Sequence, residues 1–483
     1  MTLALVERPS EKLTPLERLE ALCDPGSLSL IRSDVLSTRM GEKARRGDGV
    51  VGGSGRVDGR PVFCYAQDPS FAGGSLGEAH ADTIVRVLQL AGRARVPVIG
   101  FVESAGARLQ EGLAALGGYG RIFHEHVRLS GRVPQITVIT GASAGGGSYA
   151  PALNDFVVMT EAATMFLTGP AVVAEVMGEE LSAVDLGGPK VHDRNGVSHF
   201  TAPTDADAAV LVRDLLDYLP QQAGERPARW PTVPPPGERP DLAVPDDQRR
   251  VYDVRAVIRD VVDGGRSLEF APRWARNLVC AFARLDGRAV GVIANQPRQL
   301  GGVLDADAAQ KGARFVRTCN LFGLPLVVLV DTPGFLPGSR QEQAGVIRHG
   351  AKLVHAFAQA TVPKLTVVLR KAFGGAFIAM NSKELGADFA FAWPAAKLGV
   401  MGPEQAVGII HRRRIADAPD PGAARERLAR EYASEHLTAD AATREGFIDE
   451  VVAPSETRAR LAAALTALET GGRIAPEHTN IPL

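Results

Sequence analysis

The sequence predicts an α/β protein built from two tandem copies of one domain. In each half, short apolar runs alternate with segments of helical periodicity, and a glycine-rich turn follows one of the apolar runs. Strands that are apolar along their whole length, separated by helices, favour a layered fold with mostly parallel strand pairing. Landmarks that recur at a nearly constant spacing indicate that the second half repeats the first.

The two copies are identified by three pairs of landmarks, each 228 positions apart (286 − 58, 301 − 73, 325 − 97). These pairs are Asp58-Gly59-Arg60 with Asp286-Gly287-Arg288, Gly73-Gly74 with Gly301-Gly302, and Pro97 with Pro325. The glycine-rich turns also correspond, because Pro134 precedes Gly146 by 12 positions and Pro363 precedes Gly375 by 12. A shift held this steadily indicates two copies of one domain.

Apolar runs rich in Val and Ile give the predicted strands, and periods of three to four residues give the helices. The predicted strands are 97–102, 136–139 and 156–159 in the first copy and 326–330, 365–369 and 389–393 in the second. The clearest helical periods cover 83–90, 309–322 and 346–357.

The domain plan has four parts. Residues 1–48 form a polar, helical leader, with a helix over 15–22 that stops at Asp24-Pro25-Gly26. The first copy occupies 49–220 and the second 251–483. Between them, 221–250 carries seven prolines among charged residues and reads as a semi-rigid linker.

Composition narrows the function classes. With 483 residues, 45% hydrophobic content and a net charge of −1, the chain is expected to be globular, with neither a nucleic-acid nor a membrane partner. Four widely spaced cysteines form no Cys-x-x-Cys pair, so we expect reduced thiols, no bound metal and a cytoplasmic location. The N-terminus has no secretion signal and no run has membrane-helix length.

The two glycine-rich turns are the candidate reactive sites. Each lies between a predicted strand and a stretch that can be helical, and the first amides of a helix have no intrahelical acceptor. Such amides can hold an oxyanion, and one donor of this kind contributes about 3 kcal/mol in a transition state. Small residues needed only for tight packing are the alternative explanation. Two copies in register favour a reaction with two carbonyl substrates.

Other catalytic signatures are absent from the sequence. There is no Gly-x-Ser-x-Gly elbow, no His-Glu-x-x-His and no P-loop. We expect His124, His126, His349 and His355 to be solvated or capping residues. Arg108 could bind a phosphate or form a surface ion pair with Glu103 or Glu111. Since no acid–base pair stands out, a substrate or cofactor is expected to bring its own base.

Several motifs together identify a resemblance that covers the chain from about residue 50 to its end. They are 104–112 (SAGARLQEG), 144–152 (AGGGSYAPA), 186–192 (LGGPKVH) with 196–199 (GVSH), 331–335 (DTPGF), 370–380 (RKAFGGAFIAM) and 480–483 (NIPL). The chain resembles the carboxyltransferase (β) subunit of biotin-dependent acyl-CoA carboxylases, of the actinobacterial acetyl-/propionyl-CoA type. The resemblance implies two tandem crotonase-like (ββα-repeat) domains.

The resemblance also implies roles for residues. The amides of Gly145 and Gly146 would hold the thioester oxygen of an acyl-CoA on the first copy. Those of Gly375 and Ala376 would hold the ureido oxygen of carboxybiotin on the second. Gly106, Ala107 and Arg108 would contact the substrate, and Ile378 would line the acyl pocket.

Partners follow from the same resemblance. The family forms a hexamer, a trimer of dimers, with the active site at a dimer interface. Biotin would arrive on a separate biotinylated α subunit, since this chain has neither a Met-Lys-Met biotin-acceptor motif nor an ATP-binding signature. The expected reaction carboxylates acetyl-CoA or propionyl-CoA to malonyl-CoA or methylmalonyl-CoA.

The sequence departs from the family pattern in two places, and three alternative functions remain open. Ala105 stands where the family more often has glycine, and a basic patch at 39–46 (Arg39, Lys43, Arg45, Arg46) does not align clearly. The alternatives are the carboxyltransferase subunit of an acyl-CoA decarboxylase, a crotonase-type hydratase and a catalytically silent β subunit. A hydratase would need a pair of glutamates and a single copy of the fold.

Overall fold

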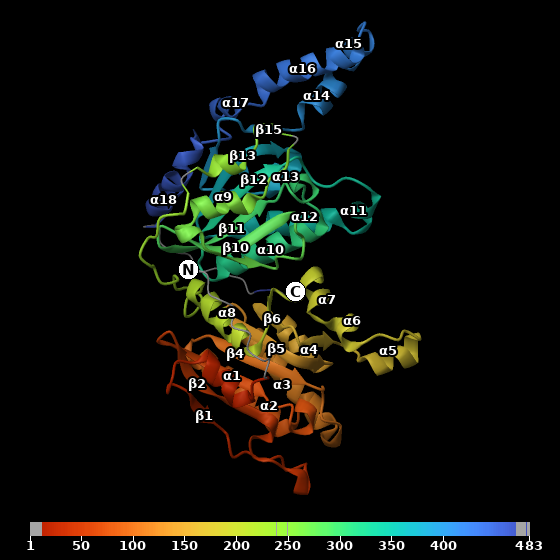
Figure 1. The fold of residues 1–483 in the computed structure, drawn as a ribbon, viewed down its shortest axis with the longest axis vertical. Helices are drawn as coiled ribbons and strands as arrows, with labels where there is room; N and C mark the ends of the chain where they lie inside the picture. Colours follow the sequence, from red (N-terminus) through yellow and green to blue (C-terminus); the bar gives the residue numbers. More distant parts are fainter. Residues whose placement is uncertain (1–11, 238, 249, 470–479, 481–483) are drawn as a thin grey trace. The chain divides into compact units, whose positions relative to one another are not determined.

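A computed structural model describes residues 12–237, 239–248, 250–469 and 480, and these divide into two compact units (Figure 1). The first unit contains the described residues up to Ala223 together with Asn480, and the second begins at Gly224. The division falls inside the predicted linker 221–250. Asn480 joins the first unit through its side-chain amide, which donates to Asp155 at 2.8 Å, whereas the sequence plan placed it in the second copy.

The first unit is built on an eight-stranded sheet with the order β1-β2-β3-β4-β5-β6-β8, and β7 pairs with β5. Strands β3 to β6 and β8 run parallel, and β1, β2 and β3 are antiparallel. The bounds are β1 Ser29–Ile31, β2 Val50–Val57, β3 Arg60–Gln67, β4 Val98–Ser104, β5 Gln135–Ala144, β6 Phe156–Thr160, β7 Thr164–Phe166 and β8 Phe200–Ala202.

The second unit repeats this plan with the order β16-β14-β13-β12-β11-β10-β9, and β15 pairs with β13. Its strands are β9 Ser267–Phe270, β10 Leu278–Leu285, β11 Arg288–Asn295, β12 Leu326–Thr332, β13 Lys364–Phe373, β14 Phe389–Ala392, β15 Lys397–Gly399 and β16 Glu450–Val451. The predicted α/β class, the duplication and the mostly parallel pairing are therefore confirmed.

Helices cover the sheets in both units (Figure 1). In the first unit they are α1 Pro15–Leu22, α2 Glu78–Ala94, α3 Leu113–Leu129, α4 Gly146–Ala152, α5 Pro170–Met177, α6 Ala183–Gly187, α7 Pro189–Asn195 and α8 Asp205–Tyr218. In the second they are α9 Val254–Val261, α10 Ala306–Leu321, α11 Ser339–Gln343, α12 Val346–Gln359, α13 Gly374–Ala379, α14 Pro403–Ile410, α15 Arg412–Ala416, α16 Pro421–His436, α17 Ala439–Arg444 and α18 Thr457–Leu468.

An antiparallel hairpin opens each sheet, and its turn is the repeated Asp-Gly pair. Asp58 and Gly59 join β2 to β3 with φ of 49° and 79°, and Asp286 and Gly287 join β10 to β11 with φ of 53° and 75°. Positive φ at both central residues defines the two-residue turn that suits twisted strands. From the sequence these pairs were predicted only to be landmarks of the repeat, and the hairpins were not predicted.

The second repeated glycine pair brings a loop against a strand end. Gly74 and Gly302 both have positive φ, and a Cβ at either would overlap a backbone carbonyl oxygen, that of Glu103 or of Asp331. Glu103 and Asp331 are each the last residue but one of their strands, β4 and β12. Both strands are buried at every residue, so the glycine pairs place a loop beside the carboxyl ends of the central strands.

In the described part of the leader, residues 12–48, α1 is the only α-helix. Thr14 caps this helix through a reciprocal pair of bonds with Glu17, and Pro15 occupies its first position. Beyond α1 the leader forms β1 and short 3₁₀ turns rather than more α-helix. Within α1, Arg18 is fully buried and donates from Nε to Asp205 at 2.7 Å and from a terminal nitrogen to Glu103 at 3.0 Å. The leader is therefore part of the first unit.

Most of the predicted linker packs on the second unit. Trp230 donates its amide to the Gly287 carbonyl at 2.9 Å, and Thr232 donates to the Asp286 carboxylate at 2.9 Å. Residues Pro240–Ala243 form a 3₁₀ turn. The segment is a fixed part of the second unit instead of a spacer. In the described parts of the chain, no helix is long and apolar enough to span a bilayer.

Candidate functional site

The two glycine-rich turns occupy equivalent places in the two units. Strand β5 ends at Ala144 and α4 begins at Gly146, while β13 ends at Phe373 and α13 begins at Gly374. Gly145 and Gly374 correspond, with φ of +57° and +63°, which a residue with a side chain adopts only under strain. Each turn thus follows the carboxyl end of a central parallel strand, where ligands bind in open α/β sheets.

In the first turn the amide of Gly145 is already used. It donates to the Phe166 carbonyl at 3.1 Å, so this amide does not face a ligand, in contrast to the prediction. Gly146 opens α4, and the first amides of a helix have no intrahelical acceptor. Its amide therefore remains the donor of the predicted pair that can reach a substrate oxygen.

Tyr119, on α3, supports this turn and was missed by the sequence analysis. A Cβ at Gly146 would lie 2.7 Å from the Tyr119 ring, so the ring requires glycine there. The Tyr119 hydroxyl lies 3.3 Å from the Ser104 hydroxyl and accepts from the Gly147 amide. Burial raises the pKa of Tyr119, which keeps the phenol neutral and able to donate. No motif marks this tyrosine in the sequence.

The second turn opens onto a cavity of about 680 Å³. Gly375 is exposed, with nothing within 4 Å of the position of a Cβ, and the next residue, Ala376, is buried. The cavity is lined by Gln248, Pro333, Gly334, Phe335, Lys371, Phe373, Gly374, Gly375, Lys397, Val400, Met401, Gly402, Pro403, Glu404 and Gln405. It therefore joins the predicted turn to the Asp-Thr-Pro-Gly-Phe motif.

Ile378 lies on α13, three positions after Gly375, and is 50% exposed. This exposure rules out the alternative that it is a core residue of the helix. It is not among the residues that line the cavity of about 680 Å³. Its role as an acyl-pocket residue remains a prediction.

A buried ion pair underlies the second turn. The Arg370 Nε donates to Asp331 Oδ2 at 3.0 Å, and an Arg370 terminal nitrogen donates to three carbonyls of residues 245–250. The guanidinium carbon lies 5.0 Å from the centre of the Tyr252 ring. Burial raises the pKa of the Asp331 carboxyl, opposed by the charges of Arg370 and Lys371. This network fixes the last residues of β12 and β13.

Arg108 has a different environment from the one predicted. Its side chain is fully buried and pairs with Asp48 at 2.7 Å and Glu111 at 2.8 Å. The same guanidinium donates to the carbonyls of Asp48 and Ser75, and it lies 5.0 Å from the centre of the Phe71 ring. Glu103, the other predicted partner, pairs with Arg18 and Lys12. Contact between Arg108 and a phosphate would require these buried pairs to open.

Gly106 and Ala107 lie on the loop that Arg108 anchors. The Gly106 carbonyl accepts from the Leu76 amide at 2.8 Å, and its amide donates to the Ser104 hydroxyl at 3.2 Å. Ala107 forms an isolated parallel β-bridge with Leu76. Ser104 also contacts Tyr119, so this loop and the first glycine turn meet at one end of the sheet.

Two of the four histidines expected at the surface are buried. His124 and His355 are exposed, but His126 and His349 are not. His126 lies 2.8 Å from the Gln135 amide oxygen, and burial lowers the pKa of the imidazole to about 4. The expectation was wrong for His126 because it lies on the face of α3 that packs against the sheet. It lies at the amino end of β5, away from the turn that follows that strand.

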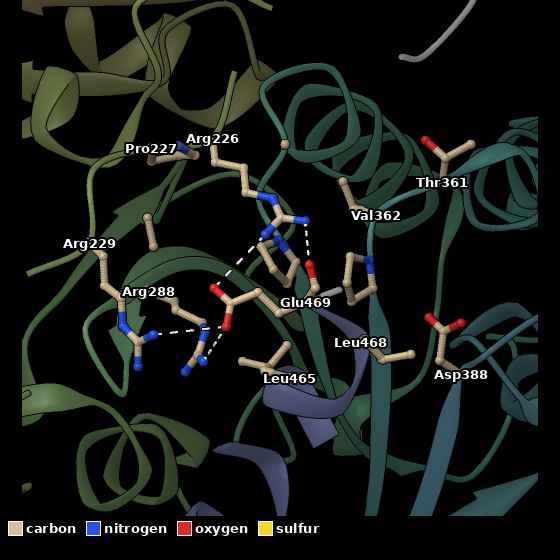
Figure 2. Close-up of a pocket in the computed structure, with 14 residues that line it drawn as sticks. Arg226, Pro227, Arg229, Arg288, Thr361, Val362, Asp388, Leu465, Leu468 and Glu469 are labelled. Carbon is tan, nitrogen blue, oxygen red and sulfur yellow. Dashed lines mark hydrogen bonds and ion pairs between the residues drawn. The ribbon is translucent and has the colours of Figure 1, made fainter. Parts of the chain in front are cut away.

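Another cavity, of about 210 Å³, lies at the amino ends of β12 and β13 (Figure 2). Figure 2 shows three arginines converging on Glu469, with Arg288 pairing at 2.7 Å and Arg229 and Arg226 at 3.8 and 3.9 Å. The chain's own carboxylate thus occupies the cationic part of this cavity. The Glu469 carboxylate links the end of α18 to Arg226 and Arg229 by ion pairs. This cavity therefore offers no reactive group.

The described residues contain no cluster of three or more His, Cys, Asp or Glu side chains that could hold a metal ion. The polar groups at the two turns include backbone amides, a tyrosine, serines and lysines, and the cavity at the second turn is also lined by Gln248, Glu404 and Gln405. They suit stabilisation of oxyanions and carboxylates.

Residues 6–481 match the family model described as the carboxyl transferase domain. This chain belongs to the carboxyl transferase family. It is 45% identical to the propionyl-CoA carboxylase carboxyltransferase subunit of Haloferax mediterranei, over 98% of this chain and 94% of that protein. It is 41% identical to the methylmalonyl-CoA decarboxylase subunit alpha of Propionigenium modestum, over 99% and 94%.

The fold agrees with a solved member of the family. The transcarboxylase 12S structure with bound methylmalonyl-CoA, described as a hexamer, matches with a TM-score of 0.93 at 45% identity. The match covers 98% of this chain and 92% of that one. The resemblance identified from the sequence motifs is thus confirmed, together with the two crotonase-like domains. The chain is an enzyme of biotin-dependent carboxyl transfer to acyl-CoA.

Proposed function

We propose that this chain is the carboxyltransferase subunit of a biotin-dependent acyl-CoA carboxylase that carboxylates acetyl-CoA, propionyl-CoA or both. The products are malonyl-CoA and methylmalonyl-CoA. The observation that carries the proposal is the pair of equivalent glycine turns at the carboxyl ends of β5 and β13. One turn serves each of the two carbonyl groups that the reaction polarises.

At the first turn the Gly146 amide donates to the thioester oxygen, which gains negative charge as the α-proton leaves. A donor aimed at this developing charge stabilises the transition state more than the ground state. The Tyr119 hydroxyl holds the adjacent Gly147 amide, so the turn is rigid before substrate arrives. Gly145 supplies the backbone conformation of the turn and not a donor.

At the second turn the amides of Gly375 and Ala376 donate to the ureido oxygen of biotin. Bound carboxybiotin supplies the carboxyl group and, after its release, the base that removes the α-proton. This division of labour agrees with the sequence, in which no acid–base pair stands out. The open space above Gly375 lets a ring approach the backbone closely.

The remaining predicted substrate residues act in two ways. Arg108 holds the Gly106–Ala107 loop through its buried pairs, and this loop contacts the acyl-CoA. The Gly106 amide and carbonyl keep their bonds to Ser104 and Leu76 and fix the loop. Ile378 limits the length of the acyl chain. Because these contacts involve a substrate, they are tested by comparing the activity of variants on acyl-CoAs of different chain length, and not by measuring protein stability.

Biotin is delivered by a separate biotinylated α subunit, and the chain assembles as a hexamer like the transcarboxylase 12S subunit it resembles. Its location is the cytoplasm. The four buried free cysteines, which include Cys23 and Cys64 with sulfurs 4.0 Å apart and no disulfide, support a reducing compartment.

The second candidate function is decarboxylation of methylmalonyl-CoA or malonyl-CoA. It is favoured by the 41% identity to a decarboxylase subunit, which is close to the 45% identity to a carboxylase subunit. The two reactions use the same two turns in opposite directions. Partner subunits decide the direction.

The experiment combines the purified chain with a biotinylated α subunit, ATP, bicarbonate, and acetyl-, propionyl- or butyryl-CoA. Carboxylated product supports the proposal. ATP-independent, biotin-dependent loss of carbon dioxide from methylmalonyl-CoA without forward activity would favour the decarboxylase instead. Ala376→Pro removes one amide donor and is expected to lower turnover about 100-fold or more. Ala372→Ser, in β13 just before the turn, keeps every amide and is its control.

A further inference from the structure

Two lysines face the same cavity as the second glycine turn. Lys371 on β13 and Lys397 on β15 are partners in the parallel register of these strands, and both line the cavity of about 680 Å³. Side chains that pair in register project from the same face of a sheet. Two ammonium groups therefore lie in the cavity that also contains Gly374 and Gly375.

The duplication supplies an internal comparison. In the first unit the corresponding register pair on β5 and β7 is Ala142 and Thr164. The next pairs also correspond, since Ser143–Met165 matches Ala372–Leu398. The backbone at this place is thus the same in both units, and it does not need lysine at either position. The two cations are a feature of the second unit's site.

The acids near these two cations are Glu404, which lines the same cavity, and Asp331. Asp331, the acid beneath the turn, already accepts from Arg370 at 3.0 Å, and it lies 4.0 Å from the Lys371 ammonium. Lys371 makes one long contact with the Gln248 carbonyl, at 3.4 Å, and its side chain is 16% exposed. For Lys397, the structure gives the ammonium no ion pair or hydrogen bond within the described residues.

We infer that Lys371 and Lys397 form a carboxylate subsite that receives the N-carboxyl group of carboxybiotin while the glycine turn receives its ureido oxygen. This inference rests on the proposed function. The first unit handles a neutral thioester at the equivalent place and has no cations there. The second unit handles an anionic carboxylated urea and has two.

The subsite affects binding more than the chemical step. The ammonium groups stabilise the carboxylate of the incoming group, and this negative charge leaves the carboxyl group when neutral carbon dioxide is released. An interaction made in the bound state and lost on the way to the transition state lowers KM and kcat together. Removing the lysines is thus expected to raise the forward KM for carboxybiotin up to about tenfold and to raise the forward kcat with it, so that kcat/KM changes little.

In the reverse direction neutral biotin enters, so its KM is expected to stay unchanged. The reverse kcat is also expected to change little, because the transition state no longer contains this interaction and the overall equilibrium constant links the forward and reverse kcat/KM. A merely structural role for the lysines would change both KM values together. Methylmalonyl-CoA, the other substrate of the reverse reaction, also carries a carboxylate. Its KM shows whether the lysines bind that carboxylate instead of the one on carboxybiotin.

The test compares the full-length natural chain with a single variant, Lys397→Thr, and a double variant that combines Lys371→Ala and Lys397→Thr. These substitutions install the residues found at the equivalent positions of the first unit. Forward rates are measured with free carboxybiotin and propionyl-CoA, and reverse rates with methylmalonyl-CoA and free biotin. Lys352→Gln, an exposed lysine on α12, is the matched control. The tryptophan fluorescence spectrum checks the fold, because all three tryptophans lie in the second unit.

Equilibrium binding provides a readout without turnover. Calorimetry compares the affinities of two stable probes. One is N1-carboxymethyl-biotinamide, an anion, and the other is the neutral compound in which the N1-carboxymethyl carboxylate is replaced by a carboxamide. The natural chain is expected to bind the anion about tenfold more tightly, and the double variant to bind both equally. Equal binding of the two probes by the natural chain would overturn the subsite. A raised KM for methylmalonyl-CoA alone would assign the lysines to the acyl carboxylate and would also overturn it.

Failure of the proposed function gives a different result. In that case the natural chain transfers no carboxyl group to propionyl-CoA, with or without activity in the reverse direction. If transfer proceeds normally but the variants keep the natural KM for carboxybiotin, only the lysine subsite is wrong.

Discussion

Arg370 and Asp331 form a buried ion pair that joins the carboxyl ends of β13 and β12, with Nε and Oδ2 3.0 Å apart. The equivalent residues in the first unit are Gly141 and Glu103. There the cation comes from the leader, since Arg18 donates to Glu103 at 3.0 Å. Both units thus neutralise an acid beside the glycine turn, and they use cations from different parts of the chain.

The first prediction concerns this ion pair. Arg370→Met leaves the Asp331 carboxyl buried without its partner, and breaking a buried pair in this way costs about 3–5 kcal/mol of stability. Guanidinium unfolding followed by tryptophan fluorescence measures it in the second unit. The control is Arg427→Met, whose pair with Glu431 at 3.8 Å is more than half exposed and contributes less than about 1 kcal/mol. Equal effects of the two variants would contradict the assignment.

The second prediction concerns Gly141. A Cβ there would overlap the Glu103 carboxylate, which Arg18 holds in place, so Gly141→Ala is expected to destabilise the first unit by about 1–3 kcal/mol. Gly120→Ala on α3 is the control, with nothing within 4 Å of the Cβ position. Alanine in that helix is expected to stabilise by about 0.5–1 kcal/mol. Hydrogen exchange of the β5 amides, which reports on the first unit, should give shifts of opposite sign.

The sequence could predict the repeat, the central strands and the two turns, because their signals are local. Apolar runs such as 326–330 and 365–369 are buried on both faces, and their periodicity is unambiguous. The Asp-Gly pairs carried a hairpin signal as well, and the flanking strands could have been found from it. Residue-by-residue comparison of the copies would also have shown Lys371 and Lys397 opposite Ala142 and Thr164.

Contacts between distant segments could not be predicted. Arg18 meets Asp205 across 187 positions, and neither residue stands in a motif. Arg108 looked available for a phosphate because nothing in the sequence brings Asp48 beside it. Tyr119 was overlooked since its role depends on how α3 packs under the turn at Gly146. The hydrogen bond from the Gly145 amide to the Phe166 carbonyl depends on the register of β7 on β5.

The third prediction is a loss of stability at mildly acid pH caused by buried histidine. Burial holds the pKa of His126 at about 4, whereas an unfolded imidazole titrates near 6.5. Between these values the unfolded state binds more protons, so stability is full above pH 6.5 and falls as the pH is lowered. From pH 6.5 to 5 the loss is about 2 kcal/mol.

The control for His126 is its exposed neighbour on the same helix, His124. His126→Asn is expected to reduce the pH dependence of unfolding between pH 7 and 5, and His124→Asn to leave it unchanged. Circular dichroism at a series of denaturant concentrations measures this at each pH. His80, whose pKa burial lowers to about 3, keeps part of the dependence in both variants. An identical slope in the natural chain and His126→Asn would be evidence against a buried neutral imidazole.

The last prediction tests Ile378 as the residue that selects acyl-chain length. Ile378 is half exposed, so Ile378→Asp is expected to alter stability little while placing a charge beside an apolar acyl group. The ratio of kcat/KM for propionyl-CoA to that for acetyl-CoA is expected to fall about tenfold or more, since one methylene in an apolar pocket contributes about 1–3 kcal/mol. Ile347→Asp on α12, where the side chain is 77% exposed, is the matched control and should leave the ratio unchanged. An unchanged ratio in Ile378→Asp, with total activity retained, would remove Ile378 from the acyl pocket and leave selectivity to residues of the first unit.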